Sequence, residues 1–273
     1  MLSKATVSQF INQNRDMWDP ESVEDSNISS SSVIRIKNEL NNIARDPVPG
    51  ILVLPDDKSI SRIHALIIGP KDTPYENGFF YFLIGCSSDY PIKPPKIKLK
   101  TTGSGTVRFN PNFYKNGKVC LSIIGTWSGP EWTPALTLSS ILLSIQSLFN
   151  NKPYFNEPGF VKESHPGVSN HYNDIIQHET IRCAVCDVLE GKTQLPADIK
   201  SYIEKSFPSY YDYYSKTCDL QKKYDGLTMN DPFGEKRGIF QFEELKKRLE
   251  ILKVKNNLTI ETDVKYAIAE CGN

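Results

Sequence analysis

Four short apolar runs, separated by turn residues and by no helical segment, constrain the fold of this chain more than any other feature. Turn signals lie at Pro55-Asp56-Asp57, Gly69-Pro70 and Glu76-Asn77-Gly78. Such close spacing without an intervening helix predicts an antiparallel meander. In the last run lysines alternate strictly with apolar residues, so one face of that strand is expected to contact solvent. The runs are residues 50–55 (GILVLP), 62–69 (RIHALIIG), 78–85 (GFFYFLIG) and 96–100 (KIKLK).

Helical patterns lie on both sides of the predicted sheet. Residues 33–45 place apolar side chains at helical spacing, and Asp46-Pro47 ends that segment. A fold with one helix, four strands, a long ordered loop and then more helices belongs to the α+β class. Further helices are expected from Thr133 as cap and Pro134 as first helical residue up to Pro153, from about Ser169 to Leu189, and beyond Pro196.

These elements divide the chain into three parts. Residues 1–32 are polar and end in SNISSSS, which predicts a mobile arm that Trp18 partly anchors. Residues 33–190 contain the predicted α+β domain, and residues 191–273 form a helical extension. With 273 residues, the chain is long enough to bury a core without disulfides or metals.

Charge and composition exclude several classes of protein. The 32 basic and 32 acidic residues cancel, so no nucleic-acid partner and no acidic membrane partner is expected. No run of 18 or more apolar residues exists, and the N-terminus lacks the apolar core of a signal peptide. We therefore expect a protein of the cytoplasm and nucleus, in which the six cysteines are reduced.

The irregular stretch FNPNFYKNGKVCLSIIGTWSGPEW, residues 109–132, contains a single cysteine, Cys120. Free cysteines are most often buried packing residues. A local zinc site is excluded because no other Cys or His lies between Cys86 and His165. Long ordered loops are usually functional, so a nucleophilic role for Cys120 stays open. The amide of Asn112, eight residues upstream, is then a candidate oxyanion donor.

Four segments of this chain carry a family resemblance. In order, Gly69 to Tyr75 (GPKDTPY), Tyr90 to Pro95 (YPIKPP), Asn110-Pro111-Asn112 with Cys120, and Trp132 to Ala135 (WTPA) resemble the ubiquitin-conjugating enzyme family. The longer segments 153–160 (PYFNEPGF), 178–192 (HETIRCAVCDVLEGK) and 231–238 (DPFGEKRG) are similar to its large Z-type members.

The resemblance implies a fold, an activity and a set of partners. It implies the ubiquitin-conjugating (UBC) fold and a thioester on Cys120, which accepts ubiquitin or a ubiquitin-like protein from an activating enzyme and transfers it to a lysine of a protein substrate. Asn112 would stabilise the oxyanion or hold the loop. Ubiquitin ligases are expected partners, and Z-type relatives suggest the alternative activating enzyme. ATP is consumed upstream, so no cofactor and no metal are expected on this chain.

The chain departs from the family pattern around the active site. Asn110 replaces the usual histidine, which is mainly structural in the family. Ser122 replaces an acidic residue that often follows the cysteine, and a few extra residues before Trp132 include Glu131. The acidic residue that assists the incoming lysine is therefore not identified by the resemblance. Glu157 and Asn156 lie near its usual position and Glu131 lies among the extra residues, and each could also be an ordinary surface residue.

The resemblance also implies a surface for the activating enzyme and ligases. It comprises one side of the first helix and two loops. An exposed Ile92 would be a binding hot spot, whereas the alternative for this residue is core packing. The six residues of this predicted partner surface are Arg35, Asn38, Ile92, Thr133, Pro134 and Ala135.

Two other functional classes remain as alternatives. The chain could be a non-catalytic scaffold of the same fold that only binds ubiquitin. Cys183-x-x-Cys186 has zinc or redox spacing, although its apolar neighbours favour packing within a helix. In the extension, the aromatic segment 209–214 is expected to pack onto the domain, and the charged run 244–248 to lie on a solvated helix face.

Overall fold

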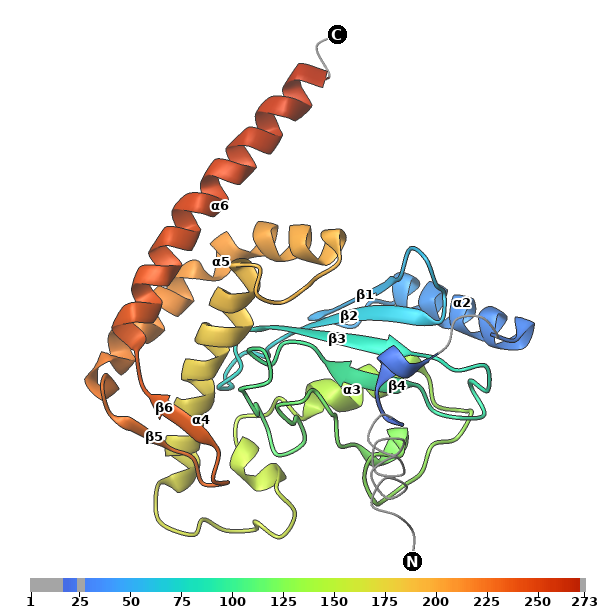
Figure 1. Cartoon of the computed structure of the whole chain (residues 1–273), viewed down its shortest axis with the longest axis horizontal. Coiled ribbons are helices and arrows are strands. Elements are labelled where there is room, and N and C mark those ends of the chain that lie inside the picture. The colour runs from blue at the N-terminus through green and yellow to red at the C-terminus, as the bar shows by residue number, and fades with distance from the viewer. Residues whose placement is uncertain (1–16, 24–27, 271–273) are drawn as a thin grey trace, which may run out of the picture.

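The computed structural model describes residues 17–23 and 28–270. Its centre is an antiparallel sheet in which each strand pairs with the next along the chain, as the turn signals predict (Figure 1). The predicted α+β class is thereby confirmed, and the arrangement agrees with the expected UBC fold. The strands in order are β1 (Ile51–Pro55), β2 (Arg62–Ile68), β3 (Phe79–Gly85) and β4 (Lys96–Leu99).

Helices pack on both sides of this sheet, and none in the part of the chain that the structure describes is both long and apolar enough to cross a membrane. Helix α4 continues into a π-helical segment, Thr180–Asp187. Together the two match the helix predicted near residues 169–189. The helices are α2 (Ser30–Arg45), α3 (Leu138–Ser147), α4 (Val168–Glu179), α5 (Ala197–Gln221) and α6 (Phe242–Glu270).

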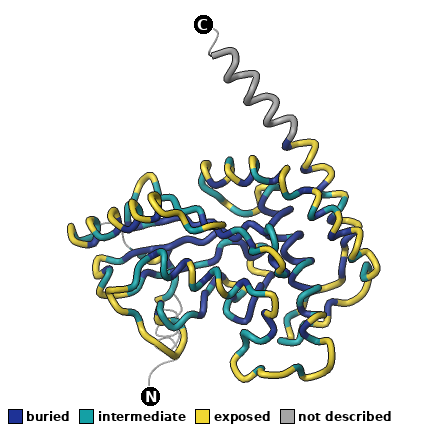
Figure 2. Tube along the Cα trace, turned by 180° about the vertical axis from the view of Figure 1, so that it is seen from behind, coloured by how far each residue is buried: buried dark blue, intermediate teal, exposed yellow. Residues whose placement is uncertain are grey.

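The two faces of the sheet are buried in two separate cores. On one face, Ile67, Phe80 and Phe82 pack with helices α2 and α3. On the other, Leu66 and Phe79 pack with α5, α6 and the π-helical segment. Because neighbouring residues of a strand point to opposite faces, β2 and β3 are buried along nearly their whole length (Figure 2). The extension is therefore a structural layer of the protein.

Helix α3 begins later than predicted. Thr133 does not cap it, because the Thr133 carbonyl accepts a turn hydrogen bond from Leu136 N instead. The cap is Thr137, whose hydroxyl accepts from Ser140 N while Ser140 Oγ accepts from Thr137 N. This reciprocal capping box satisfies two backbone donors at once, which a cap at Thr133 would not do. Residues 133–135 consequently remain in an exposed loop.

The start of the chain is more ordered than the predicted arm where it is described. Helix α2 begins at Ser30, capped by Ser29, so the predicted boundary at residue 32 falls inside this helix. Pro20 is buried, and Trp18 lies 5.8 Å from Lys98 Nζ. The rest of the predicted arm, residues 1–16 and 24–27, lies outside the described residues.

The outer face of β4 was expected to contact solvent, but it is partly covered. Lys98 pairs with Asp19 and Glu21, and its side chain is only 18% exposed. Lys100 pairs with Glu21. Alternation along β4 correctly indicates which residues face outward, but the segment that covers them lies about eighty residues away in sequence, beyond the reach of local periodicity.

The extension contains a β-hairpin that the sequence reading did not predict. Strands β5 (Thr228–Asn230) and β6 (Lys236–Ile239) pair antiparallel. Between them the Asp231 carboxylate accepts a hydrogen bond from Phe233 N, and Gly234 adopts a φ of +77°. A short side chain that accepts a hydrogen bond, followed by a glycine in the left-handed region, is typical of a turn. Asp231 and Gly234 are these two residues in the sequence.

The remaining predictions for the extension have mixed outcomes. Tyr214 is buried and its hydroxyl donates to the Asn77 carbonyl (2.7 Å), so this aromatic segment packs onto the domain as predicted. The charged run 244–248 is only partly solvated. Leu245 is buried, and Arg248 pairs with Asp187 and Glu190. Helix α6 lies against α5 and the π-helical segment, which buries this side of the helix.

Candidate active site

Cys120 follows a tight hairpin in the long loop between β4 and α3. Phe113 and Val119 form an isolated antiparallel bridge, and Gly117 closes the turn with a φ of +88°. A side chain at this position would approach the Leu99 carbonyl to 2.4 Å, so only glycine fits. The loop is thus fixed against β4, which holds Cys120 at a defined position after the turn.

Asn112 is joined to Cys120 by two hydrogen bonds. The Cys120 backbone N donates to the Asn112 carbonyl, and Asn112 Nδ2 donates to the Cys120 carbonyl, both at 2.9 Å. Asn112 Oδ1 is buried and has no hydrogen-bond partner among the described residues. In this resting state the side-chain amide holds the loop, which is one of the two roles the sequence left open for Asn112.

Asn110 is the structural centre beneath this loop. It is fully buried, and its Nδ2 donates to the Tyr75 hydroxyl (3.0 Å) and to the Leu148 carbonyl (2.8 Å). Its Oδ1 accepts from Asn112 N (2.9 Å) and from Asn156 Nδ2 (3.3 Å). An amide supplies both donor and acceptor groups here, so Asn110 can cross-link segments from four parts of the chain.

The Cys120 side chain lies in a small cleft with only 4% of its surface exposed. Three of the predicted residues, Asn112, Asn156 and Glu157, share this cleft. Two more that sequence reasoning missed, Tyr114 and Trp127, also line it. Both lie in an irregular loop, where no periodic pattern indicates which side chains face a site. The one available signal was that Trp127 belongs to the extra residues before Trp132.

Burial raises the pKa of the Cys120 thiol. The positive charges of Lys118 and Arg108 and a hydrogen bond with Tyr114 act in the opposite direction, and Glu157 adds to the increase. The net effect is a pKa above the ordinary value for a thiol, which disfavours the thiolate. Such a group needs an already activated acyl donor, in contrast to the low-pKa nucleophiles of many cysteine enzymes.

A cation behind the cleft holds the acidic candidate. Arg108 Nη2 pairs with Glu157 Oε2 (3.3 Å) and donates to the Pro111 carbonyl (2.9 Å). The guanidinium also lies 4.7 Å from the ring of Tyr114. Arg108 was not among the predicted residues, and its role follows only from the folded arrangement.

The other two predicted support residues lie away from the cleft. Ser122 is half-buried in the short 3-10 turn Ser122–Ile124 and does not line the cleft. Glu131 is exposed, also outside it. Among the acidic candidates, Glu157 is therefore the one that the fold brings beside Cys120. Its neighbour Asn156 also lines the cleft, and the Asn156 amide donates to the Leu148 carbonyl (3.1 Å).

Comparisons of the sequence with known proteins point to one family. A sequence model of the family described as "Ubiquitin-conjugating enzyme" matches residues 35–173, which is more than half of the chain. The chain belongs to the ubiquitin-conjugating enzyme family. Members of this family transfer ubiquitin through a thioester and interact with ubiquitin, an activating enzyme and ligases.

Curated relatives extend the match beyond the family domain. Ubiquitin-conjugating enzyme E2 Z of Xenopus tropicalis is 55% identical over 239 residues, covering 86% of this chain and 76% of the relative. The Homo sapiens protein of the same name is 53% identical over 241 residues, covering 87% and 68%. A probable ubiquitin-conjugating enzyme protein 17 of Caenorhabditis elegans is 45% identical over 185 residues, covering 63% and 25%. The resemblance to the large Z-type members is confirmed.

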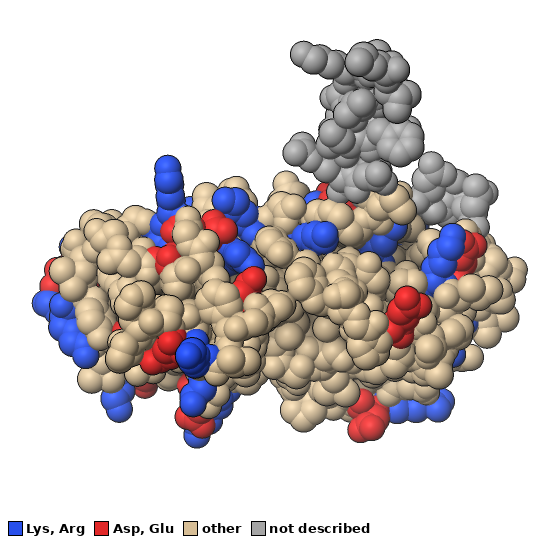
Figure 3. Space-filling model, turned by 90° about the horizontal axis from the view of Figure 1, so that it is seen from below, with Lys and Arg blue, Asp and Glu red and all other residues tan. Residues whose placement is uncertain are grey.

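The predicted partner surface of this ubiquitin-conjugating enzyme is assembled from both loops. Ile92 is 78% exposed, which excludes the core-packing alternative for it. Trp132 Nε1 donates to the Pro91 carbonyl (2.7 Å), which joins the Ile92 loop to the exposed residues 133–135. Asn38 is exposed on α2. On the face of the molecule shown in Figure 3, lysine and arginine side chains lie among aspartate and glutamate side chains.

Arg35 has a second, structural attachment. It pairs with the buried Glu39 one helical turn away, and its Nη2 donates to the carbonyls of Pro134 (3.1 Å) and Leu136 (2.9 Å). Glu39 in turn accepts from Leu138 N (2.7 Å). Arg35 therefore joins α2 to the loop before α3. The predicted role of Arg35 in partner binding would be in addition to this structural role.

Cys183 and Cys186 pack inside the protein. Both are fully buried in the π-helical segment, and burial raises the pKa of the Cys186 thiol to about 12. Within residues 17–23 and 28–270, no group of three or more His, Cys, Asp or Glu residues is arranged to hold a metal ion. A packing role accounts for both cysteines.

Proposed function

We propose that Cys120 is the residue that carries the modifier. Its thiol attacks the thioester carbonyl on the activating enzyme, and the bond from that carbonyl to the activating enzyme's cysteine breaks. The leaving thiolate takes up the proton that the Cys120 thiol releases, and a new thioester forms on Sγ. A substrate lysine nitrogen then forms an amide bond, the Cys120 thiolate leaves, and the amine proton passes to solvent. The observation that carries this proposal is the cleft that joins Cys120 to Asn112, Tyr114 and Glu157.

Asn112 and Glu157 have distinct roles in this proposal. The amide of Asn112 holds the Cys120 carbonyl and so fixes the position of the sulfur. The Glu157 carboxylate, oriented by Arg108, positions the attacking amine and favours its loss of a proton. Glu157 acts on the second step, because only that step has an attacking amine. The Asn112 contact matters most there, because the loaded Cys120 must be held in place for that amine.

Replacing Asn112 by alanine is expected to slow lysine transfer about 100-fold, the loss that a misplacement of the reacting group by about 1 Å can cause. Loading of Cys120 should fall much less. The measurement is single-turnover discharge of the purified thioester to free lysine. Asn116→Ala, which removes an exposed amide from the same loop, is the control and should discharge at the wild-type rate. A wild-type rate for Asn112→Ala would contradict the assigned role.

Ile92→Ala is expected to weaken the productive complex with the activating enzyme or a ligase about 30-fold, corresponding to about 2 kcal/mol for a hot-spot residue. Its thermal stability should not change, because the side chain is exposed. The concentration dependence of charging and of ligase-stimulated transfer measures the effect. Val161→Ala removes an equally exposed apolar side chain elsewhere and serves as the control. Equal behaviour of the two variants would argue against this surface.

The deciding experiment incubates the protein with ATP, ubiquitin or a ubiquitin-like protein, and each type of activating enzyme, followed by a non-reducing gel. A reductant-sensitive adduct supports the proposal. We propose the alternative activating enzyme as the donor, on the similarity to the Z-type members, and the enzyme that charges the protein tests this. No adduct with any donor would favour a non-catalytic ubiquitin-binding scaffold instead.

We propose that the protein is located in the cytoplasm and nucleus, because its cysteines form no disulfides in the described part of the chain. The five cysteines in the described part of the chain are all free, as expected in a reducing compartment. Imaging of a fluorescent fusion tests this, and a signal confined to the secretory pathway would contradict it.

A further inference from the structure

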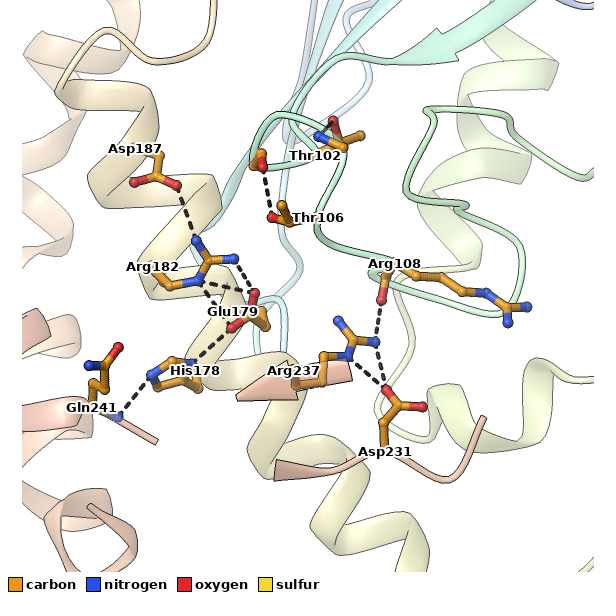
Figure 4. A network of polar contacts seen from close by, with 12 residues as sticks. Thr102, Thr106, Arg108, His178, Glu179, Arg182, Asp187, Asp231, Arg237 and Gln241 are labelled. Atoms are coloured by element: carbon orange, nitrogen blue, oxygen red, sulfur yellow. Dashed lines mark hydrogen bonds and ion pairs between the residues drawn. The ribbon is translucent and has the colours of Figure 1, made fainter. Parts of the chain in front are cut away.

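The turn between β5 and β6 lies directly behind the active-site loop. Arg237 Nη2 donates to the Arg108 backbone carbonyl at 2.6 Å, and Asp231 pairs with the same guanidinium at 2.8 Å (Figure 4). The side chains of Arg237 and Asp231 are only 2% and 0% exposed. Because this ion pair is buried and its guanidinium also donates to the Arg108 carbonyl, the Arg108 backbone is held from outside the family domain.

Phe233, at the tip of the same turn, contacts the Arg108 side chain. The Arg108 guanidinium lies 5.6 Å from the Phe233 ring and 4.7 Å from the ring of Tyr114, which lines the cleft. The cation is therefore placed between one ring of the extension and one ring of the active site. Both contacts leave Nη2 directed at the Pro111 carbonyl and at Glu157.

Phe233 also packs against the segment that precedes Glu157. Its ring lies 5.7 Å from that of Tyr154, in the short turn Pro153–Asn156 that precedes Glu157. It contacts Tyr172 of α4 edge-on at 5.1 Å. The hairpin thus reaches the segment that carries Arg108 and the segment that carries Glu157, the two halves of one ion pair.

We propose that the β5–β6 hairpin positions the active site for lysine transfer, through Arg237 on the Arg108 backbone and Phe233 on the Arg108 side chain and the Glu157 segment. The inference rests on the proposed function of Cys120. The hairpin lies outside residues 35–173, so the family domain alone does not supply this support. Phe233 and Arg237 are positioning residues, since neither lines the cleft.

The two steps of the reaction should respond differently to this support. Loading brings an activated thioester to Cys120 and does not use the Glu157 carboxylate. Transfer requires the amine nitrogen to lose a proton while it bonds to the carbonyl carbon, with Glu157 in a defined place. Misplacing such a group by about 1 Å can cost about 100-fold in rate. Loss of the hairpin contacts should therefore slow transfer selectively.

Two conservative variants of the full chain test the proposal. Phe233→Leu keeps apolar volume but removes the ring, and Arg237→Lys keeps the charge beside Asp231 but loses the fork that also reaches the Arg108 carbonyl. Each thioester is purified and discharged to lysine and, separately, to hydroxylamine, a nucleophile that is neutral at neutral pH. We expect about tenfold slower maximal discharge to lysine, with the half-saturating lysine concentration, the hydroxylamine rate and the loading rate unchanged.

Tyr214→Phe is the matched control, because it removes a different hydrogen bond between the extension and the domain, at Asn77. It should discharge to lysine at the wild-type rate. Wild-type lysine discharge in both hairpin variants would overturn the proposal. So would a joint loss of loading, lysine and hydroxylamine rates with a lowered melting temperature, since that indicates a purely structural role. If the wild-type chain forms no thioester, the proposed function itself fails.

Discussion

Cys120→Ala is expected to abolish the covalent adduct with the modifier, and Cys120→Ser to form one that survives reductant. Alanine has no nucleophile, so charging should be undetectable. A serine hydroxyl in the same place can form an oxygen ester, which thiols do not cleave as they cleave a thioester. The measurement is the charging gel run with and without reductant. Because transfer from an oxygen ester to an amine is slow, the serine adduct should also accumulate.

Cys86→Ala is the matched control for this pair. Cys86 is buried to the same degree as Cys120 but packs in the sheet core away from the cleft. Its loss should lower stability slightly and leave charging intact. A reductant-sensitive adduct on Cys120→Ala at the wild-type level would place the thioester on another cysteine and overturn the assignment of Cys120.

Glu179→Gln is expected to lower the free energy of unfolding by about 3–5 kcal/mol, as for other buried ion pairs that lose one partner. The Glu179 side chain is 3% exposed, and its carboxylate accepts from Arg182 Nε (3.1 Å) and pairs with His178 Nδ1 (3.0 Å) (Figure 4). Glutamine keeps the shape but removes the charge that Arg182 faces. Urea denaturation at neutral pH measures the loss.

The same residue gives a prediction for acid unfolding. Burial alone would raise the pKa of Glu179, but hydrogen bonds from His178 and Arg182 outweigh it and lower the pKa to about 2 from its usual value of 4.5. A carboxyl whose pKa is depressed by folding stabilises the protein above the unfolded pKa, and this contribution is lost as pH falls toward the folded pKa. The wild-type stability should therefore fall more steeply than that of Glu179→Gln between about pH 4.5 and pH 2.

An exposed ion pair provides the comparison. Asp89 and Lys93 pair at 2.6 Å with side chains 49% and 69% exposed. Asp89→Asn should cost less than about 1 kcal/mol, because solvent screens such pairs. If Glu179→Gln cost as little as Asp89→Asn, or showed the same acid slope as wild type, the carboxylate would not hold the buried network together.

Several features of the active site were outside the reach of sequence reasoning. The order Asn110-Pro111-Asn112 and Cys120 indicated the loop that we propose is reactive, and the structure places Glu157 beside it. Ser122 and Glu131 were equally plausible neighbours by sequence distance, yet both lie outside the cleft. Distance along an irregular loop does not determine side-chain direction, because no fixed period relates one residue to the next.

Local patterns in the sequence were sufficient to predict the four strands, the apolar faces of the helices and the segment that carries Cys120. These depend on local rules, such as the period of two in β4 and the turn residues between strands, which act between neighbours along the chain. Three other features became known from the folded arrangement. Ile92 is exposed, Asp19 and Glu21 pair with the outward-facing Lys98 of β4, and the hairpin that carries Phe233 and Arg237 contacts Arg108. Such contacts join residues about eighty or more positions apart, and they form because buried charges and rings must find partners in the folded protein.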